Sequence, residues 1–299
     1  MNEFKSGFVS LVGRPNVGKS TLMNHLVGEK IAIVSNRPQT TRNKIRSILS
    51  EEDCQIVFID TPGLHTPKTK LGNFMVKSAQ DALGGVDVVL YLVEPTEKVG
   101  LGDEEILKML PRDAKVMLVI NKADTVKKPD ILLTIAAYSQ KFEFSEIVPI
   151  SALTGENTDA LLAVLRKYLP YGPRYFPDDM VTDQPERQIA SEMIREKALL
   201  FLQEEIPHGI AVEIAAMKKR KKGDLVDVDA TIFCERESHK AIVIGKGGAM
   251  LKKIGAAARK DFENLLGSPI NLQLWVKVRK RWRDSDFMLR DLGYDPKKI

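Results

Sequence analysis

The chain has 299 residues, of which 43% are hydrophobic and 28% charged, and its formal net charge is +5. This length predicts two domains, and this composition excludes a disordered chain. The apolar runs are too short to span a bilayer, and the first residues lack the basic and apolar parts of a signal peptide, so we expect a cytoplasmic protein.

The charge is unevenly distributed along the chain. Residues 184–299 carry 23 Lys and Arg against 17 Asp and Glu, a net charge of +6, whereas the rest of the chain has a net charge of −1. We therefore expect the C-terminal part to meet an anionic partner. The two cysteines, Cys54 and Cys234, lie in apolar strand-like runs, so we interpret both as buried thiols in a reducing compartment.

The first predicted strand, residues 8–12, leads into the motif GxxxxGKS at residues 13–20, and helical spacing of apolar residues follows. Strand, glycine-rich loop and helix in this order predict a phosphate-binding loop. Glycines let backbone N–H groups surround an anion, and the new helix points its positive dipole end at the same place. Lys19 is expected to reach the β- and γ-phosphates, and the Ser20 hydroxyl to coordinate Mg²⁺.

A polar segment without periodicity, residues 37–42, precedes a predicted hairpin formed by residues 45–49 and 55–59. The second strand of this hairpin runs directly into the sequence DTPG at residues 60–63. An acidic residue after a buried strand suits a partner of Mg²⁺, and Gly63 would let its backbone N–H approach a γ-phosphate closely.

Strands and helices then alternate. Apolar runs are followed by helical stretches in the order 86–93, 103–110, 116–120, 130–138, 146–150 and 158–168. This alternation predicts a mostly parallel sheet with helices on both faces. Each polar motif falls just after a strand, which is the ligand-binding edge of such sheets.

The sequence NKAD at residues 121–124 is expected to select the base. Guanine presents its N1–H and N2 amino group side by side, so the Asp124 carboxylate can accept from both, whereas adenine lacks this pair of donors. We expect Asn121 to tie this loop to the phosphate loop, and the Lys122 stem to lie on the base plane. The backbone N–H of Ala152, in the sequence SAL at residues 151–153, is expected to donate to guanine O6.

The order GxxxxGKS, Thr, DTPG, NKxD and SAL resembles that of the translation-factor-related GTPases over residues 6–170. The resemblance implies binding and hydrolysis of GTP, with Lys19 on phosphate, Ser20 and Thr41 on Mg²⁺, Asp60 as an outer partner of the metal, and Gly63 on the γ-phosphate. Thr41 is preferred over Thr40. The nucleotide contacts implied in this way are Gly13, Arg14, Pro15, Asn16, Val17, Gly18, Lys19, Ser20, Thr21, Asp60, Thr61, Pro62, Gly63, Asn121, Lys122, Asp124, Ser151, Ala152 and Leu153.

One position departs from the pattern of GTPases that use a glutamine to orient the attacking water. The residue after DTPG is Leu64, which cannot form a hydrogen bond with water, so we expect slow intrinsic turnover. Similar GTPases with an apolar residue here often carry an asparagine at the position of Asn16, which leaves K⁺ open as an additional cofactor. The residues expected to act in hydrolysis are Lys19, Thr41, Asp60, Gly63 and Asn16.

Four prolines between residues 170 and 185 indicate a linker, which we place at residues 171–186. A helix with one apolar face follows, and then two strands whose apolar side chains alternate from Ile210 to Ala216 and from Val226 to Cys234. The turn between these strands carries five consecutive cations, which favour contact with a polyanion.

The sequence GKGG at residues 245–248 forms a GxxG turn between a short and a long predicted helix. Such a turn brings backbone N–H groups up to a sugar-phosphate chain, as in KH domains. A last strand puts Trp275, Lys277 and Arg279 opposite its apolar side chains. It leads into the sequence KRWR at residues 280–283, where the arginines and Trp282 are expected to contact phosphate or stack on bases.

Helix–strand–strand–helix–helix–strand is the order of a type II KH domain, placed at residues 187–283 before a C-terminal helix or tail at 284–299. The predicted RNA contacts are Lys218, Lys219, Arg220, Lys221, Lys222, Gly245, Lys246, Gly247, Gly248, Trp275, Lys277, Arg279, Lys280, Arg281 and Arg283.

A GTPase domain followed by one type II KH domain resembles a family of bacterial ribosome-assembly GTPases over nearly the whole chain. The resemblance implies an α/β P-loop GTPase domain with a mostly parallel sheet, followed by a smaller α+β KH domain. It implies GTP or GDP and Mg²⁺ as ligands, and a monomer that binds the 3′ region of small-subunit ribosomal RNA on the pre-ribosomal small subunit. Loss of the γ-phosphate is expected to rearrange residues 37–42 and 61–70.

Two other functions stay open at this point. Leu64 leaves room for an RNA-binding scaffold that holds GTP with little hydrolysis, and single-turnover phosphate release with and without K⁺ separates that scaffold from a switch. The basic C-terminal part also suits peripheral contact with anionic lipid at the inner face of the cell membrane, although the GxxG turn favours RNA.

Overall fold

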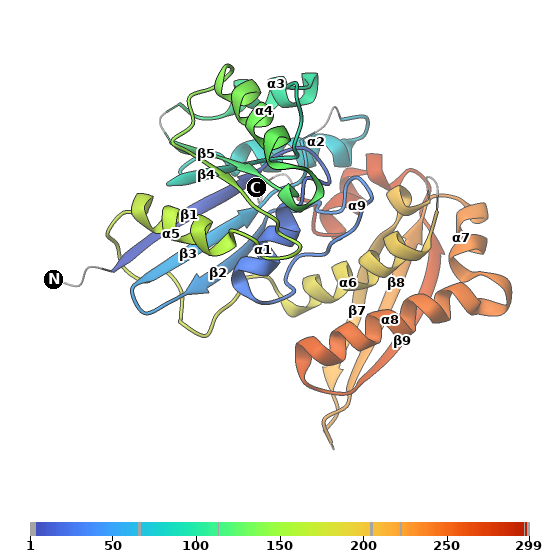
Figure 1. Ribbon diagram of the computed structural model, residues 1–299. Helices are drawn as coiled ribbons and strands as arrows, with labels where there is room; N and C mark the ends of the chain where they lie inside the picture. The colour runs from blue at the N-terminus through green and yellow to red at the C-terminus, as the bar shows by residue number, and fades with distance from the viewer. Residues whose placement is uncertain are drawn as a thin grey trace.

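Two β-sheets organise the chain, which is known here from a computed structural model that describes residues 4–64, 67–112, 114–203, 206–221, 223–295 and 297. A six-stranded sheet belongs to the N-terminal part, and a three-stranded sheet belongs to the C-terminal part (Figure 1). Among the helices of these described residues, none is long and apolar enough to cross a bilayer.

The six-stranded sheet has the strand order β2-β3-β1-β4-β5-β6. Strand β2 is antiparallel to β3, and the other neighbours are parallel, so the mostly parallel sheet is confirmed. The strands are β1 (Lys5–Val12), β2 (Ile45–Ser50), β3 (Cys54–Asp60), β4 (Val88–Val93), β5 (Lys115–Ile120) and β6 (Glu146–Pro149).

Helices cover both faces of this sheet, as predicted, because its central strands are apolar on both sides. Side chains of α1 (Lys19–Val27) and α5 (Thr158–Tyr168) pack with Leu90 on one face. Side chains of α2 (Lys70–Asp81), α3 (Leu101–Met109) and α4 (Lys128–Ser139) pack with Tyr91 on the other. Successive residues of β4 therefore contribute to opposite cores.

Helix α2 was not among the predicted elements. It begins after Thr69, whose side chain caps the helix by accepting from the Gly72 N–H at 3.1 Å. Gly72 and Asn73 lie near its start and weaken the local helical signal. Its buried side chains lie on one face of the helix, and their packing against the rest of the protein stabilises the helical conformation.

The C-terminal part has the element order α6-β7-β8-α7-α8-β9, which confirms the type II KH order. Its sheet runs β7-β8-β9, with β7 antiparallel and β9 parallel to β8. The elements are α6 (Glu186–Phe201), η2 (Pro207–Gly209), β7 (Ala211–Lys219), β8 (Val226–Cys234), α7 (Glu237–Ile244), η3 (Lys246–Gly248), α8 (Ala249–Leu266), β9 (Ile270–Val278), η4 (Trp282–Asp284) and α9 (Asp286–Asp291).

A β-bulge interrupts β7 between Ile214 and Ala216. Beyond the bulge Met217, and not Ala216, packs on the core, so the alternation predicted through Ala216 is wrong. A bulge inserts one extra residue into a strand and moves the following side chains to the other face, which periodicity alone does not reveal.

The proline-rich linker runs as an extended strap along the edge of the six-stranded sheet. Tyr171 bridges to Lys5, and Thr182 bridges to Ser47 in the edge strand β2. Between these points the Gln55 side chain accepts from the Tyr175 N–H at 2.7 Å and from the Phe176 N–H at 3.0 Å. The strap covers backbone groups that an open edge strand would expose.

An apolar cluster joins the two parts of the chain. Its buried members come from α2 and from the C-terminal part, and the Trp282 and Tyr294 rings stack with centroids 6.3 Å apart. Helix α9 lies between the two sheets (Figure 1). The buried residues of the cluster are Leu71, Phe74, Met75, Ala211, Phe233, Trp282, Leu289 and Tyr294.

Candidate functional site

The loop at residues 13–18 joins β1 to α1 and requires glycine at both ends. A Cβ atom on Gly13 would lie 2.4 Å from the Leu92 carbonyl oxygen, and one on Gly18 would lie 2.2 Å from Asn121 Nδ2. Gly18 also has φ of +96°, which L side chains rarely adopt. The loop is therefore packed tightly against the strands beside it.

Lys19 lies at the start of α1 and is only 6% exposed. Its Nζ donates to the carbonyl oxygens of Gly13 at 3.0 Å and Arg14 at 2.9 Å. Burial lowers the pKa of Lys19 to about 8, although the nearby Asp60 carboxylate acts to raise it. A phosphate group in the loop would stabilise this buried cation.

Three side-chain oxygens converge beside Lys19. Ser20 Oγ donates to Asp60 Oδ2 at 2.5 Å and lies 2.9 Å from Thr41 Oγ1, which donates to Asp60 Oδ2 at 3.2 Å. Asp60 is fully buried, burial raises its pKa, and its Oδ1 atom has no hydrogen-bond partner among the described residues. A hard cation that prefers oxygen ligands would satisfy this cluster, so the residues fit Mg²⁺.

The preference for Thr41 over Thr40 is supported by where the two side chains point. Thr40 Oγ1 donates to the carbonyl oxygen of Arg37 at 2.6 Å, away from the oxygen cluster. Thr41 is the member of the pair that reaches Ser20 and Asp60.

The DTPG turn packs directly against the phosphate loop. A Cβ atom on Gly63 would lie 2.7 Å from the Pro15 backbone, so glycine permits the close approach. The Thr61 hydroxyl donates to the Leu11 carbonyl oxygen at 2.7 Å and holds the turn to β1. Leu64 is buried in the apolar cluster on the α2, α3 and α4 face, and its aliphatic side chain offers no hydrogen-bonding group.

The base-recognition loop is tied to the phosphate loop, as predicted. Asn121 Nδ2 donates to the Val17 carbonyl oxygen at 2.8 Å, and Asn121 Oδ1 accepts from the Ala152 N–H at 2.9 Å. The Ala152 N–H, which the sequence assigned to guanine O6, is therefore engaged by Asn121. The Lys122 ammonium pairs with Glu94, and the exposed Asp124 lies in the short helix η1 (Ala123–Thr125).

One cavity of about 280 Å³ connects these groups. It is lined by the phosphate loop, DTPG, NKAD and SAL together with parts of residues 33–41. The predicted contacts on its wall are Pro15, Asn16, Gly18, Lys19, Ser20, Thr21, Gly63, Asn121, Lys122, Asp124, Ser151, Ala152 and Leu153. Those that do not line it are Gly13, Arg14, Val17, Asp60, Thr61 and Pro62.

Sequence reasoning missed a buried support of the phosphate loop. Arg14 Nε forms an ion pair with Asp103 Oδ2 at 3.0 Å, and Asp103 Oδ1 accepts from the Tyr91 hydroxyl at 2.8 Å. Asp103 is 1% exposed. No local motif marks it, because its partner lies far away in the sequence.

Asn16 has φ of +67° and lines the nucleotide cavity. Its Nδ2 donates to the Asn36 carbonyl oxygen at 2.9 Å. The residue proposed as a K⁺ ligand is thus joined to the segment that carries Thr41.

The GxxG turn forms the second candidate site, between α7 and α8. Gly245, Gly247 and Gly248 all have positive φ, and a Cβ atom on Gly247 or Gly248 would meet no atom within 4 Å. The backbone here is open to a ligand. A groove of about 420 Å³ continues from Gly248 between α8 and β9 and is also lined by Lys252, Gly255, Ala256, Arg259, Leu251, Leu272 and Leu274.

Lys252 and Arg259 in this groove were not predicted as RNA contacts. They are seven residues apart, as are Gly248 and Gly255, and this spacing places them on one face of α8. The combination of small and basic residues at helical spacing is the signal that would have found them.

The structure does not bring every predicted RNA residue to this groove. Trp275 is 59% exposed, but it lies on the opposite face of the sheet from Leu274, as do Lys277 and Arg279. The Arg279 guanidinium lies 5.9 Å from the centroid of the Phe233 ring. Lys280 and Arg281 follow this strand and are exposed.

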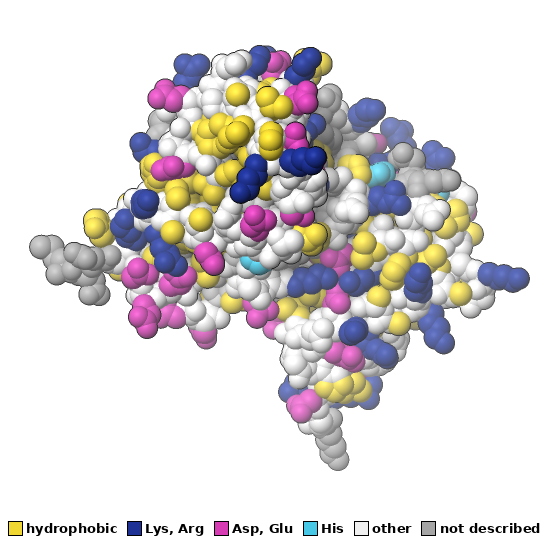
Figure 2. Space-filling model, in the orientation of Figure 1, with side chains coloured by type: hydrophobic (Ala, Val, Ile, Leu, Met, Phe, Trp, Pro, Cys, Tyr) yellow, Lys and Arg dark blue, Asp and Glu magenta, His cyan; other side chains and the backbone are white. Residues whose placement is uncertain are grey.

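The five-cation turn lies at the other end of α8 from the GxxG turn, about 27 Å away along an 18-residue helix. Arg220 pairs with Asp227 at 2.7 Å, and Lys219 pairs with Asp224 at 2.8 Å, so part of the positive charge is neutralised within the hairpin. Lys218 and Lys221 are exposed, and the predicted contact Lys222 lies outside the described residues. Figure 2 shows Lys and Arg side chains spread over the C-terminal part on the viewed face.

Trp282 corrects the sequence interpretation. It is fully buried, and its Nε1 donates to the Gly209 carbonyl oxygen at 2.8 Å. The expectation that this tryptophan stacks on bases is wrong, because the ring belongs to the apolar cluster between the two parts of the chain. The adjacent Arg283 pairs with Glu235 at 2.6 Å.

The fold and the site define a P-loop GTPase domain followed by a type II KH domain. Residues 8–122 match the family model described as 50S ribosome-binding GTPase, and residues 205–283 match that of the KH domain. The chain belongs to the Era family of GTPases. It is 57% identical to GTPase Era of Clostridioides difficile (strain 630) over 98% of this chain and 100% of the relative. It is 54% identical to GTPase Era of Clostridium kluyveri (strain ATCC 8527) over 97% and 99%.

Two solved structures of Era superpose on nearly the whole chain. A variant of Aquifex aeolicus Era bound to GDP·AlF4⁻ gives a TM-score of 0.94 at 42% identity, covering 98% of this chain and 100% of that chain. Era in complex with MgGDPNP and nucleotides 1506–1542 of 16S ribosomal RNA gives the same TM-score and identity, covering 98% and 99%.

Proposed function

We propose that this GTPase binds GTP with Mg²⁺ in the cavity above, hydrolyses GTP to GDP and phosphate, and holds the 3′ region of small-subunit ribosomal RNA through its KH domain during maturation of that subunit. The observation that carries the proposal is the single cavity shared by the phosphate loop and the base loop, with the Ser20 and Thr41 hydroxyls at its wall and Asp60 bonded to both behind them. The RNA partner is supported by the 42% identical Era that binds nucleotides 1506–1542 of 16S ribosomal RNA.

Each residue has a definite task in the proposed nucleotide site. Lys19 neutralises phosphate oxygens, Ser20 and Thr41 supply metal ligands, and Asp60 holds both hydroxyls in place. Bound Mg²⁺ supplies positive charge at the phosphate oxygens. Gly63 brings its backbone N–H towards the γ-phosphate, and Asp124 accepts from the guanine edge.

We assign no side chain among the described residues to orient the attacking water. Leu64 is buried in the core, so we expect slow turnover, and K⁺ at Asn16 remains the proposed source of extra charge. The same burial supports a second candidate function, an RNA-binding scaffold that holds GTP with little hydrolysis.

In the proposed RNA site, the backbone of residues 245–248 lies against the sugar-phosphate chain, and Lys246, Lys252 and Arg259 neutralise phosphates. We assign residues 6–170 to the GTPase domain, 171–186 to the linker, 187–283 to the KH domain and 284–299 to a C-terminal segment. We further propose a monomeric cytoplasmic protein, with peripheral contact at the inner face of the cell membrane as the alternative location.

Phosphate release from GTP tests the enzymatic part of this proposal. Wild-type protein should release phosphate only with Mg²⁺, and Lys19→Ala and Asp60→Ala should release none while keeping their circular dichroism spectra. Wild-type rates in either variant would contradict the proposed roles. Replacing K⁺ by Na⁺ in the same assay tests the monovalent cation and separates the switch from the scaffold.

Binding of a 3′-terminal 16S ribosomal RNA fragment tests the other part. The protein with a non-hydrolysable GTP analogue should bind this fragment more tightly than a scrambled RNA of equal length. Equal affinity for both RNAs would refute the sequence preference. In a separate assay, protein that stays on anionic vesicles equally well with and without competing RNA would favour the membrane alternative.

A further inference from the structure

The segment between α1 and β2, residues 28–44, carries Thr41 and lies between the nucleotide cavity and α6. On its nucleotide side it offers the Thr41 hydroxyl to Ser20 and Asp60. On its other side, the Glu196 carboxylate accepts from the Val34 N–H at 2.9 Å and from Lys30 Nζ at 2.6 Å. The segment is thus held by both domains.

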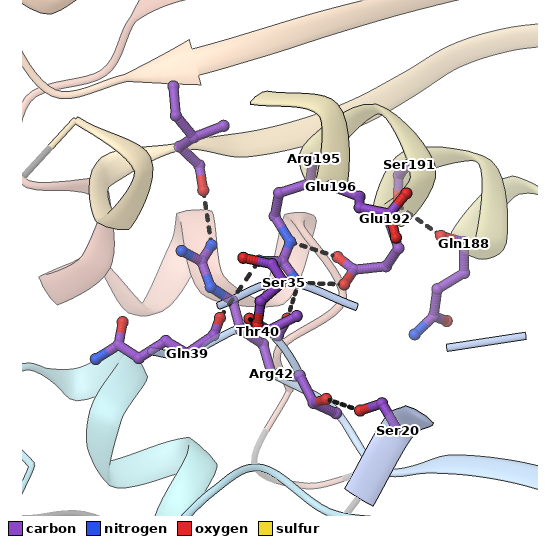
Figure 3. Close-up of polar contacts among 12 residues, drawn as sticks. Ser20, Ser35, Gln39, Thr40, Arg42, Gln188, Ser191, Glu192, Arg195 and Glu196 are labelled. Carbon is purple, nitrogen blue, oxygen red and sulfur yellow. Dashed lines mark hydrogen bonds and ion pairs between the residues drawn. The ribbon is translucent and has the colours of Figure 1, made fainter. Parts of the chain in front are cut away.

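Thr41 itself stands between two attachments to the C-terminal domain. On the N-terminal side, Arg195 donates to the carbonyl oxygens of Thr40 and, at 3.3 Å, Gln39 (Figure 3). On the C-terminal side, Arg42 donates to the carbonyl oxygens of Ile210 at 2.7 Å and His208 at 3.1 Å. A movement of α6 relative to the GTPase domain would therefore pull on the backbone next to the metal-binding hydroxyl.

The backbone at this attachment is strained. Gln39 has φ of +61°, in the left-handed region that non-glycine residues rarely adopt. Strain of this kind persists where surrounding contacts hold the residue in place, and here Arg195 holds the Gln39 carbonyl.

The electrostatics also distinguish this contact from ordinary packing. Arg42 and Arg195 are each 1% exposed. Arg195 forms an ion pair with the Glu192 carboxylate. Burial lowers the pKa of Arg42, and the positive charge of Arg195 lowers it further. Burial also acts to lower the pKa of Arg195, but the charge and hydrogen bond of Glu192 outweigh burial and raise that pKa. Two buried guanidinium groups are costly, and apolar side chains of similar volume would often give a more stable interface.

We infer that Arg195 is a positioning residue for GTP hydrolysis, which holds Thr41 in the nucleotide site from the KH side of the domain boundary. The inference rests on the proposed GTP hydrolysis at this site. Because coupling between two sites is reciprocal, a nucleotide that fixes Thr41 also strengthens the contact between residues 28–44 and α6. The same guanidinium thus links the γ-phosphate site to the placement of the KH domain.

The test compares substitutions on the buried face of α6, at Arg195, with a substitution on its exposed face, at Arg187. Arg195→Met keeps an apolar stem of similar length but removes every donor, and Arg195→Lys restores the charge without the planar fork. Arg187→Met is the control on the exposed face of the same helix. With Arg195→Met we expect kcat to fall about tenfold, the loss that corresponds to one hydrogen bond from a charged group. The Kd for GDP should not change, because GDP lacks the γ-phosphate. The KM for GTP and the Mg²⁺ concentration at half-maximal kcat should rise, because GTP binding is coupled to the contact that Arg195 makes. Arg195→Lys should recover part of kcat.

Three outcomes are decisive when melting temperatures are measured beside the kinetics. If wild type hydrolyses GTP and folded Arg195→Met has the kcat and Mg²⁺ midpoint of Arg187→Met, the inference fails while the proposed hydrolysis stands. If wild type releases no phosphate from GTP, both fail. If Arg195→Met is unfolded at the assay temperature, Arg195→Lys decides, because an ammonium lacks the planar fork with which Arg195 contacts the two carbonyl groups and Glu192 together. Wild-type kcat in that variant would overturn the inference.

Discussion

Replacing Gly18 by alanine should weaken nucleotide binding through a residue that is distant in sequence. The new Cβ atom would lie 2.2 Å from Asn121 Nδ2, so Asn121 must move. That movement breaks its hydrogen bonds to the Val17 carbonyl oxygen and the Ala152 N–H. At about 1 kcal/mol for each bond, the loss of about 2 kcal/mol raises the Kd for GDP roughly 30-fold.

Gly28 provides the matched control at the other end of α1. Its φ is +78°, so alanine there meets the same kind of backbone strain, about 1–2 kcal/mol, but its Cβ atom would touch nothing within 4 Å. Gly28→Ala should therefore lower the free energy of unfolding and leave the Kd for GDP unchanged. Fluorescent GDP titration gives the affinities, and urea unfolding gives the stabilities.

A double-mutant cycle with Asn121→Ala identifies the mechanism. In the Asn121→Ala background the clash and both hydrogen bonds are already gone, so adding Gly18→Ala should change the GDP affinity little. Equal effects of Gly18→Ala in both backgrounds, or an unchanged affinity in the single variant, would refute the reasoning.

Three further predictions concern the base, the phosphate and the RNA. Asp124→Asn should lower GTP affinity by about 10⁴-fold and confer XTP binding, because one hydrogen-bond acceptor becomes a donor. Titration with both nucleotides checks this, and unchanged GTP affinity would show that Asp124 does not select the base. Because burial lowers the Lys19 pKa to about 8 from 10.5, the unfolded state binds more protons between these values, so the free energy of unfolding without nucleotide should rise from pH 8 to 10.5. Denaturation of Lys19→Met should lack this rise, and an identical pH profile would show that Lys19 does not titrate there. Lys246→Asp combined with Gly247→Asp should abolish RNA binding while GTP hydrolysis persists, and wild-type RNA affinity should fall steeply with salt; full RNA affinity in the double variant would contradict the KH site.

The GTPase motifs were predictable because each lies in a short continuous stretch. A glycine-rich loop, an acidic turn or an NKxD sequence carries its own chemistry, and the alternation of strands and helices places all of them at one edge of the sheet. The Asn121 tie between two such loops followed from this logic and is confirmed. The type II KH order was equally readable from periodicity.

The contacts between the domains were not predictable in this way. Trp282 looked like an RNA-stacking residue because it stands among arginines, yet it is buried against Tyr294 and Gly209. Asp103 and Arg195 stand in helices without motifs, and their partners, Arg14 and the Thr40 carbonyl, are remote in sequence. Tertiary packing assigns the roles of such residues, and local patterns do not record it.

The apolar cluster between α2 and the C-terminal part has a consequence for the order in which the protein is made. Residues 70–81 leave the ribosome about 200 residues before Trp282, Leu289 and Tyr294, which cover Leu71, Phe74 and Met75. At about 5–20 residues per second, this interval lasts about 10–40 s. During that time these three side chains of α2 lack their partners, so the helix presents an uncovered apolar face. A nascent chain is therefore prone to aggregate through this face until its C-terminal part has been made.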